Sequence, residues 1–308
     1  MPKVSVVIPT HNRADLLGRA VRSALAQTHG DLEVLITDDA SSDGTGEMVA
    51  RIGDARVKYF RHDTARGVSA ARNTAMTNAT GEFIAFLDDD DEWLPEKLRI
   101  QLDRFAQLSS SVGLICSGHL EVDSVANQVV SEVIPAERGW VFERLLRRGS
   151  FNHTSTILVR SECFAEVGLF DITFVYAEDL DMWLRIAQKY EFDFVTMPLT
   201  RLYFQRDGLS RNYDAMISGV EAHLDKYRDF FQDNPAAFTE RLQKLASFYC
   251  IAGNARRGRR IFCQAIANRP LAVKSYLGVA LSMMGPRMFR ICCGAGIWTE
   301  ARRLLGYR

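Results

Sequence analysis

The first 90 residues alternate between short apolar runs and longer segments in which apolar residues recur every three or four positions. The short runs predict buried strands, and the longer spacing predicts amphipathic helices. The expected strands are residues 4–9, 33–37, 57–60 and 83–87, and the expected helices are residues 14–27, 43–52, 68–79 and 95–108. Alternation of helices with strands that are apolar throughout indicates a mainly parallel sheet with helices on both faces.

The pattern becomes mixed after about residue 110 and helical after residue 214. In the mixed part we expect strands at 113–116, 154–159, 192–197 and 201–205, a hairpin over 120–134 turning near Ala126 and Asn127, and helices at 140–146 and 179–189. The sequence therefore predicts an α/β domain over residues 1–213, followed by a helical extension over residues 214–308.

Composition excludes some classes of protein. With 47% hydrophobic and 25% charged residues, the chain has the usage of an ordinary globular protein. The longest membrane-like run, residues 275–286, is uncharged but much shorter than the roughly 20 residues that a membrane span needs. The N-terminus lacks the pattern of a signal peptide, and the six cysteines show no Cys-x-x-Cys spacing. These features favour a cytoplasmic protein with reduced thiols and no transmembrane helix.

The formal charge is zero, with 38 basic and 38 acidic residues, but the two signs are segregated along the chain. Residues 241–308 hold 13 lysines and arginines and a single acid, Glu300. A basic, apolar helical region too short to span a bilayer is typical of a peripheral anchor at an anionic membrane surface. The alternative is a helical cap that packs on the acidic part of the chain. No nucleic-acid-binding module is recognisable, so nucleic acid is not an expected partner.

Three polar clusters follow the predicted strands. They are Pro9 to Arg13, Asp38 to Asp43, and the four consecutive acids Asp88 to Asp91. Ligands bind at the carboxyl ends of strands in open parallel sheets, so we expect these clusters to line one site. Consecutive carboxylates at a strand end suit a hard divalent cation such as magnesium or manganese, although an isolated acidic run can also be a solvated turn. Neither a P-loop nor a dinucleotide-binding glycine motif is present, so a metal is the expected route to phosphate.

Five segments in order carry a resemblance to a known family: VSVVIPTHNR, ITDDASSDGT, RGVSAARNTA, FIAFLDDDDEWLP and YAEDLDMWLR. Over residues 3–212 the chain resembles glycosyltransferase family 2, whose members have the GT-A nucleotide-sugar fold. The resemblance implies an inverting, hexosyltransferase-type enzyme that uses a nucleotide-sugar, most often UDP-linked. The acceptor it implies is a hydroxyl of a cell-surface polysaccharide or a lipid-linked glycan.

The resemblance also implies roles for particular residues. The nucleotide-sugar would be bound by Pro9, Thr10, Asp39, Arg72, Asp88 and Asp89, and the metal, manganese or magnesium, would be ligated by Asp90. Asp179 matches the general base, with Glu178 beside it at the acceptor. Asp181 is expected at the surface. Trp183 is expected to serve in packing, with stacking against the acceptor as the alternative.

One segment departs from the family pattern. Many members have a metal-binding histidine after the base, and Arg206 stands at about that position here. Because arginine cannot ligate a metal, we expect Arg206 to pair directly with the donor diphosphate. A surface arginine is the alternative reading.

Two other functions are weighed against the transferase. A nucleotidyltransferase of the same fold would need a glycine-rich loop and a lysine after the first strand, and His11, Asn12 and Arg13 supply neither. A non-catalytic module that binds a nucleotide-sugar or glycan and docks at membranes is the alternative from a different class. The presence of Asp90 and Asp179 argues against it.

Overall fold

The computed structural model describes residues 3–149, 151–204, 212–287 and 289, and Arg206 lies outside these ranges. The chain divides into two compact units. Unit 1 comprises residues 1–142, 151–173 and 178–209, and unit 2 comprises residues 143–150, 174–177 and 210–308. The predicted domain boundary at residue 213 stays a prediction, because unit 2 also includes two short segments from earlier in the chain.

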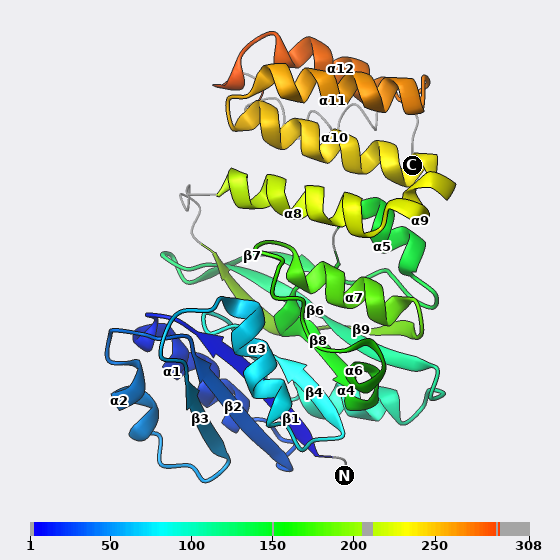
Figure 1. The fold of residues 1–308 in the computed structure, drawn as a ribbon. Coiled ribbons are helices and arrows are strands. Elements are labelled where there is room, and N and C mark those ends of the chain that lie inside the picture. Colours follow the sequence, from blue (N-terminus) through cyan, green and yellow to red (C-terminus); the bar gives the residue numbers. More distant parts are fainter. Residues whose placement is uncertain (1–2, 150, 205–211, 288, 290–308) are drawn as a thin grey trace. The chain divides into compact units, whose positions relative to one another are not determined.

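Unit 1 is built on a mixed sheet (Figure 1). The strands β3 (Val57–Arg61), β2 (Leu32–Asp38), β1 (Val4–Thr10) and β4 (Phe83–Phe86) lie in this order and are parallel. Starting from β1, the chain adds β2 and β3 on one side and then β4 on the other side of β1, so the direction of winding switches between β1 and β4. Nucleotide ligands of open α/β sheets bind at such a switch point, beside the carboxyl ends of the strands.

The second half of the sheet contains both strand directions. β8 (Ile157–Arg160) pairs antiparallel with β4 and with β6 (Val112–Asp123), and β9 (Glu191–Phe204) runs parallel to β6. β5 (Glu92–Trp93) pairs with β9, and β7 (Gln128–Val133) forms the predicted hairpin with β6. The α/β fold with a mixed sheet is therefore confirmed.

Two strand predictions in this half need correction. Residues 192–197 and 201–204 belong to the single strand β9, because its pairing with β6 shifts register near Pro198 without ending. The expected strand at 154–159 begins instead as a 3-10 turn at Thr154–Thr156, before β8 starts.

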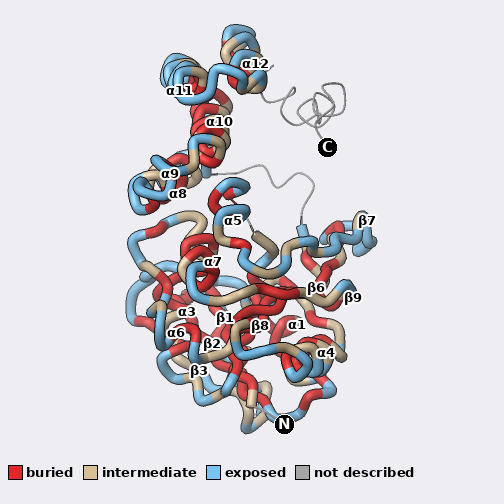
Figure 2. Tube along the Cα trace, turned by 90° about the vertical axis from the view of Figure 1, so that its right-hand side faces the viewer, coloured by how far each residue is buried: buried red, intermediate tan, exposed pale blue. Residues whose placement is uncertain are grey.

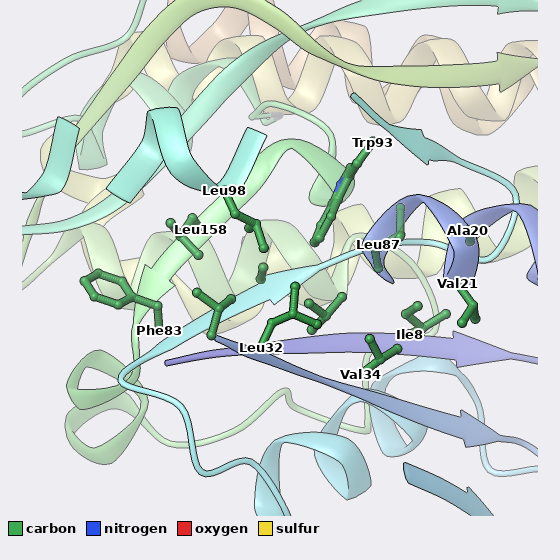
Figure 3. Close-up of a cluster of buried hydrophobic side chains, with 14 of the residues drawn as sticks. Ile8, Ala20, Val21, Leu32, Val34, Phe83, Leu87, Trp93, Leu98 and Leu158 are labelled. Atoms are coloured by element: carbon green, nitrogen blue, oxygen red, sulfur yellow. The ribbon is translucent and has the colours of Figure 1, made fainter. Parts of the chain in front are cut away.

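Helices cover both faces of the sheet. α1 (Ala14–Leu25), α2 (Thr45–Ala50) and α4 (Lys97–Phe105) contribute to one apolar core, part of which is drawn in Figure 3. In that core Ile8 of β1, Val34 of β2 and Leu87, which follows β4, belong to one cluster with Val21 of α1 and Leu98 of α4. The opposite face is covered by α3 (Val68–Thr77), α6 (Ser161–Val167) and α7 (Glu178–Ala187). This layering holds the loops after β1, β2 and β4 at one edge of the sheet.

Unit 2 is helical, as expected for the C-terminal part of the chain. Its helices are α5 (Phe142–Arg148), α8 (Tyr213–Lys226), α9 (Arg228–Asp233), α10 (Pro235–Ile251), α11 (Ala255–Asn268) and α12 (Val273–Ser282). α10 contributes much of the core of this unit, and Figure 2 shows that it is buried along much of its length. Among the helices that the structure describes, none combines the length and the apolarity needed to cross a bilayer.

Candidate functional site

The loops after β1, β2 and β4, together with the start of α3, line one cleft of about 390 Å³. Its walls are Pro9, Thr10, His11, Arg13, Asp39, Val68, Ala71, Arg72, Asp88, Asp89 and Asp90. The structure therefore brings together six residues expected at the nucleotide-sugar and the one expected at the metal. The volume lies within the range of about 300–1,000 Å³ that small-molecule sites occupy.

The acidic turn after β4 divides its carboxylates between two environments. Asp89 accepts a hydrogen bond from Thr10 Oγ1 at 2.7 Å and another from Arg13 Nη1 at 2.9 Å, and the same nitrogen lies 2.8 Å from Asp90 Oδ2. Burial raises the pKa of Asp89, and burial together with the charge of Asp88 raises the pKa of Asp90, although Arg13 opposes both shifts. These two carboxylates line the cleft and share Arg13 as a neighbouring cation.

Asp91, the fourth acid, has a structural role. It is buried and accepts a hydrogen bond from Ser155 Oγ at 2.6 Å, and the same hydroxyl accepts one from the Asp88 amide at 3.0 Å. Burial raises the pKa of Asp91 well above its usual value, with the Asp88 charge as a second cause. Ser155 thus anchors both ends of the acidic turn to the segment that precedes β8.

Asp39 holds the loop that leads into α3. Its carboxylate accepts hydrogen bonds from His62 Nδ1 at 2.7 Å, from the Arg66 amide at 2.8 Å and from the Gly67 amide at 2.7 Å. Burial would raise the pKa of Asp39, but these hydrogen bonds outweigh it and hold the pKa below its usual value. The expected contact of Asp39 with the nucleotide-sugar stays a prediction, and both of its carboxylate oxygens already accept hydrogen bonds within the protein.

Arg72 joins the acidic turn to the start of α7. Its guanidinium donates to Asp88 Oδ1 at 2.9 Å and to Glu178 Oε1 at 2.8 Å. The Arg72 side chain is only 5% exposed, and these carboxylates raise its pKa despite its burial. Arg72 therefore fixes the distance between the residues expected at the donor and those expected at the acceptor.

Asp179 lies beside this bridge, in the first turn of α7. Its Oδ1 accepts a hydrogen bond from the Leu180 amide at 2.7 Å, and Thr154 Oγ1 lies 3.5 Å from its other oxygen. Burial and the neighbouring charge of Glu178 raise the pKa of Asp179 to about 6, against the opposing charge of Arg72. A carboxyl with a pKa in this range suits a general base that works near neutral pH.

Backbone strain accompanies the site. Asn12, Ala40 and Ala177 adopt left-handed conformations with φ of 53°, 62° and 58°. Each directly adjoins a residue described above: Arg13, Asp39 or Glu178. Left-handed non-glycine residues are uncommon and concentrate where neighbouring structure fixes a functional geometry.

Near the site, the structure corrects the expectation for Asp181, confirms the one for Trp183 and gives contacts to two further residues, Arg13 and Ser155. Asp181 is fully buried and pairs with Arg185 at 2.9 Å, because the face of α7 that carries it packs inward rather than toward solvent. Trp183 is fully buried against Phe86, so its packing role is confirmed. Sequence reasoning placed Arg13 in a polar cluster at the site without a specific role, and it did not single out Ser155. The contacts of both residues join segments more than 60 residues apart.

The charges of the cleft bear on a metal. Among the residues that the structure describes, no three His, Cys, Asp or Glu side chains form a group that would hold a metal by themselves. The lining residues nevertheless include four carboxylates against two guanidinium groups, an excess of negative charge. Magnesium typically takes only one or two protein carboxylates and completes its shell with phosphate and water, so Asp90 and its neighbours fit that kind of site.

Comparison with known proteins gives the chain its family. Residues 5–154 match glycosyl transferase family 2. Over 185 residues the chain is 31% identical to UDP-Glc:alpha-D-GlcNAc-diphosphoundecaprenol beta-1,3-glucosyltransferase WfgD of Escherichia coli, covering 60% of this chain and 70% of that protein. It is 32% identical over 191 residues to WfaP of E. coli, which carries the same activity in its name as WfgD. This match covers 61% of this chain and 72% of that protein.

Solved structures show the same fold at lower sequence identity. S. aureus TarS 1–349 in complex with UDP-GlcNAc matches with a TM-score of 0.61 and 16% identity, over 94% of this chain and 91% of that one. The mannosyltransferase PcManGT from Pyrobaculum calidifontis, in complex with GDP-Man and Mn2+, matches with a TM-score of 0.59 and 20% identity, over 96% and 86% of the two chains. The chain belongs to glycosyltransferase family 2 and is a transferase with the GT-A fold.

Proposed function

We propose that this enzyme transfers a sugar from a UDP-sugar to a hydroxyl of a lipid-linked glycan, with inversion at the anomeric carbon. The observation that carries the proposal is the double ion pair of Arg72 with Asp88 and Glu178, which ties the donor cleft to the segment bearing Asp179. The names of the WfgD and WfaP relatives, with UDP-glucose as donor and a diphosphoundecaprenol-linked acceptor, support the substrate classes. In this proposal residues 1–213 form the catalytic domain and residues 214–308 the extension.

The chemical step needs one proton acceptor. In the proposed mechanism Asp179 takes the proton of the acceptor hydroxyl, whose oxygen bonds to the anomeric carbon while the bond to the diphosphate oxygen breaks. The nucleoside diphosphate leaves from the opposite face, which accounts for inversion. Glu178 and Arg72 keep Asp179 beside the donor, and positioning both substrates in line supplies the entropic part of the catalysis.

The donor must bind in a cleft that already has an excess of negative charge. Pro9 and Thr10 would contact the nucleoside part, and Asp88 and Asp89 would lie near the ribose and the metal. Asp90, whose side chain is 36% exposed, would hold manganese or magnesium, which would neutralise the diphosphate as it leaves. A metal-free cleft of this charge is expected to bind a nucleoside diphosphate weakly.

The base of the donor and its metal dependence are tested together by thermal shift. The protein is heated with UDP, TDP, GDP or CMP, each with and without manganese, and Asp90→Asn serves as the matched variant. The proposal expects stabilisation by UDP only with manganese, and loss of that stabilisation in Asp90→Asn. Stabilisation by GDP instead would replace the donor class, and no shift with any nucleotide would contradict the proposed donor site.

We also propose that the enzyme works as a peripheral protein at the inner face of the cytoplasmic membrane. A diphosphoundecaprenol-linked acceptor, as in the names of the relatives, would be anchored in that membrane. The predominance of basic residues from position 241 onward supports contact with anionic lipid.

A further inference from the structure

Arg13 brings a positive charge to the two carboxylates of the acidic turn that face the cleft. It directly precedes α1, and its Nη1 donates to Asp89 Oδ1 at 2.9 Å and to Asp90 Oδ2 at 2.8 Å. One nitrogen thus bridges the two carboxylates that face the cleft. Asp90 Oδ2 cannot accept this bond and ligate a divalent cation without bringing two positive centres close together.

The two arginines of the cleft differ in how firmly they are held. Arg72 is 5% exposed and is bound at both ends by Asp88 and Glu178. The Arg13 side chain is 47% exposed and forms ion pairs with Asp89 and Asp90 of the acidic turn. Solvent reaches Arg13 but hardly reaches Arg72, so the ion pairs of Arg13 are the weaker ones and Arg13 is the more readily exchanged of the two arginines.

The acidic turn has supports other than Arg13. Thr10 Oγ1 remains on Asp89 Oδ2, and the Ser155 hydroxyl remains on Asp91 and on the Asp88 amide. Arg13 itself lines the cleft, where a bound nucleotide-sugar would bring in a diphosphate as an anionic partner. A guanidinium suits this partner because it offers several parallel N–H donors to phosphate oxygens.

We propose that Arg13 is a positioning residue that occupies Asp89 and Asp90 in the donor-free enzyme and moves to the donor diphosphate when the donor binds. The transfer frees Asp90 for the cation, so nucleotide and cation bind with positive coupling and the cation alone binds weakly. This inference rests on the proposed function, since it requires a nucleoside diphosphate and a divalent cation in this cleft.

The test measures manganese binding without catalysis, by electron paramagnetic resonance of free Mn²⁺, with and without UDP. Wild type is expected to bind manganese more tightly with UDP by a factor of about 5–150, the ordinary range of coupling between two ligands. In Arg13→Gln, manganese alone should bind more tightly than in wild type, and the UDP-dependent factor should be smaller than in wild type, retaining only the direct attraction between cation and diphosphate. Arg13→Lys keeps one charge and should lie between the two.

The control is Arg22→Gln. Arg22 is an exposed residue of α1, so this substitution removes the same charge without changing a contact of the acidic turn. A general electrostatic effect would raise manganese affinity equally with and without UDP and leave the coupling factor unchanged, and that result in Arg13→Gln would overturn the inference. If Arg13→Gln does not fold, wild type alone still tests the inference: manganese affinity that is the same with and without UDP would overturn it. Failure of UDP to bind at all would contradict the proposed function instead.

Discussion

At the scale of single residues, the carboxyl groups in and around this site differ widely in pKa. Asp39 is held below its usual pKa by donors from His62 and the backbone, whereas burial raises the pKa of Asp91 well above it. Asp179 lies between these extremes, with a pKa of about 6. Environment, rather than residue type, therefore distinguishes a loop anchor from a buried structural acid and from the proposed proton acceptor.

The pKa of Asp179 predicts an acid limb in the pH dependence of the enzyme. If Asp179 is the general base, it works only when ionised. With a pKa of about 6, kcat/KM should rise with pH through a midpoint at about 6 and level off about two pH units higher. Asp179→Asn should lower kcat by a factor of about 10²–10⁴ and remove this limb. Steady-state rates from pH 4.5 to 8.5 check both, and an Asp179→Asn variant that retains the limb would contradict the assignment.

Glu178→Gln supplies the control for that assignment. The negative charge of Glu178 contributes to the raised pKa of Asp179, so its removal should move the acid limb to lower pH. Loss of Glu178 also frees one side of Arg72, which shifts the limb in the same direction. A limb that moves upward would mean that another group titrates.

At the scale of elements, the sequence predicted what depends on local pattern and missed what depends on distant contacts. The parallel strands β1 to β4, the three polar clusters and the β6–β7 hairpin followed from hydrophobic periodicity and strand ends. β5 has two residues and exists only because β9 pairs with it. Asp181 looked like a surface acid because its pairing with Arg185 inside the packed face of α7 leaves no pattern in the apolar residues.

The packing of α11 on α10 predicts that Gly258→Ala destabilises the protein, although glycine-to-alanine substitutions inside helices usually stabilise. A methyl group at Gly258 would lie 2.4 Å from Cys250 Sγ and 2.8 Å from the Ala246 carbonyl oxygen, both on α10. Glycine to alanine inside a helix normally stabilises by about 0.5–1 kcal/mol, but here the added atom should cost about 1–3 kcal/mol because the backbone of α10 cannot yield. Urea denaturation followed by circular dichroism measures the change.

Gly18→Ala is the matched control for that substitution. In α1 the nearest atom to an added methyl group is Arg22 Nη1 at 3.2 Å, the end of a flexible side chain. Gly18→Ala should therefore be neutral or stabilising. Equal effects of the two substitutions would show that α10 and α11 do not approach each other as closely as described.

At the scale of the whole chain, the segregation of charge is the feature that the catalytic site does not explain. On α11, Arg257 pairs with Glu221, while exposed Arg256 and Arg260 have no ion-pair partner within the part of the chain that the structure describes. These three arginines border a cleft of about 630 Å³. Unit 2 also exposes large apolar side chains at or beside α12: Leu271, Val273, Tyr276, Met283 and Met284. Unpaired basic groups and exposed apolar groups in one unit are the two components of an interfacial membrane contact.

This combination predicts which arginines govern membrane association. Each basic residue near an anionic surface contributes about 1 kcal/mol, so replacing both Arg256 and Arg260 by glutamine should weaken binding to phosphatidylglycerol vesicles roughly 30-fold. The loss should shrink as salt screens the surface. The control replaces Arg22 and Arg51, two exposed arginines of unit 1, which removes the same charge from a region with excess acid. Vesicle sedimentation distinguishes the cases: if both double variants lose binding equally, net charge rather than α11 drives association, and if neither does, the basic region serves the fold instead of the membrane.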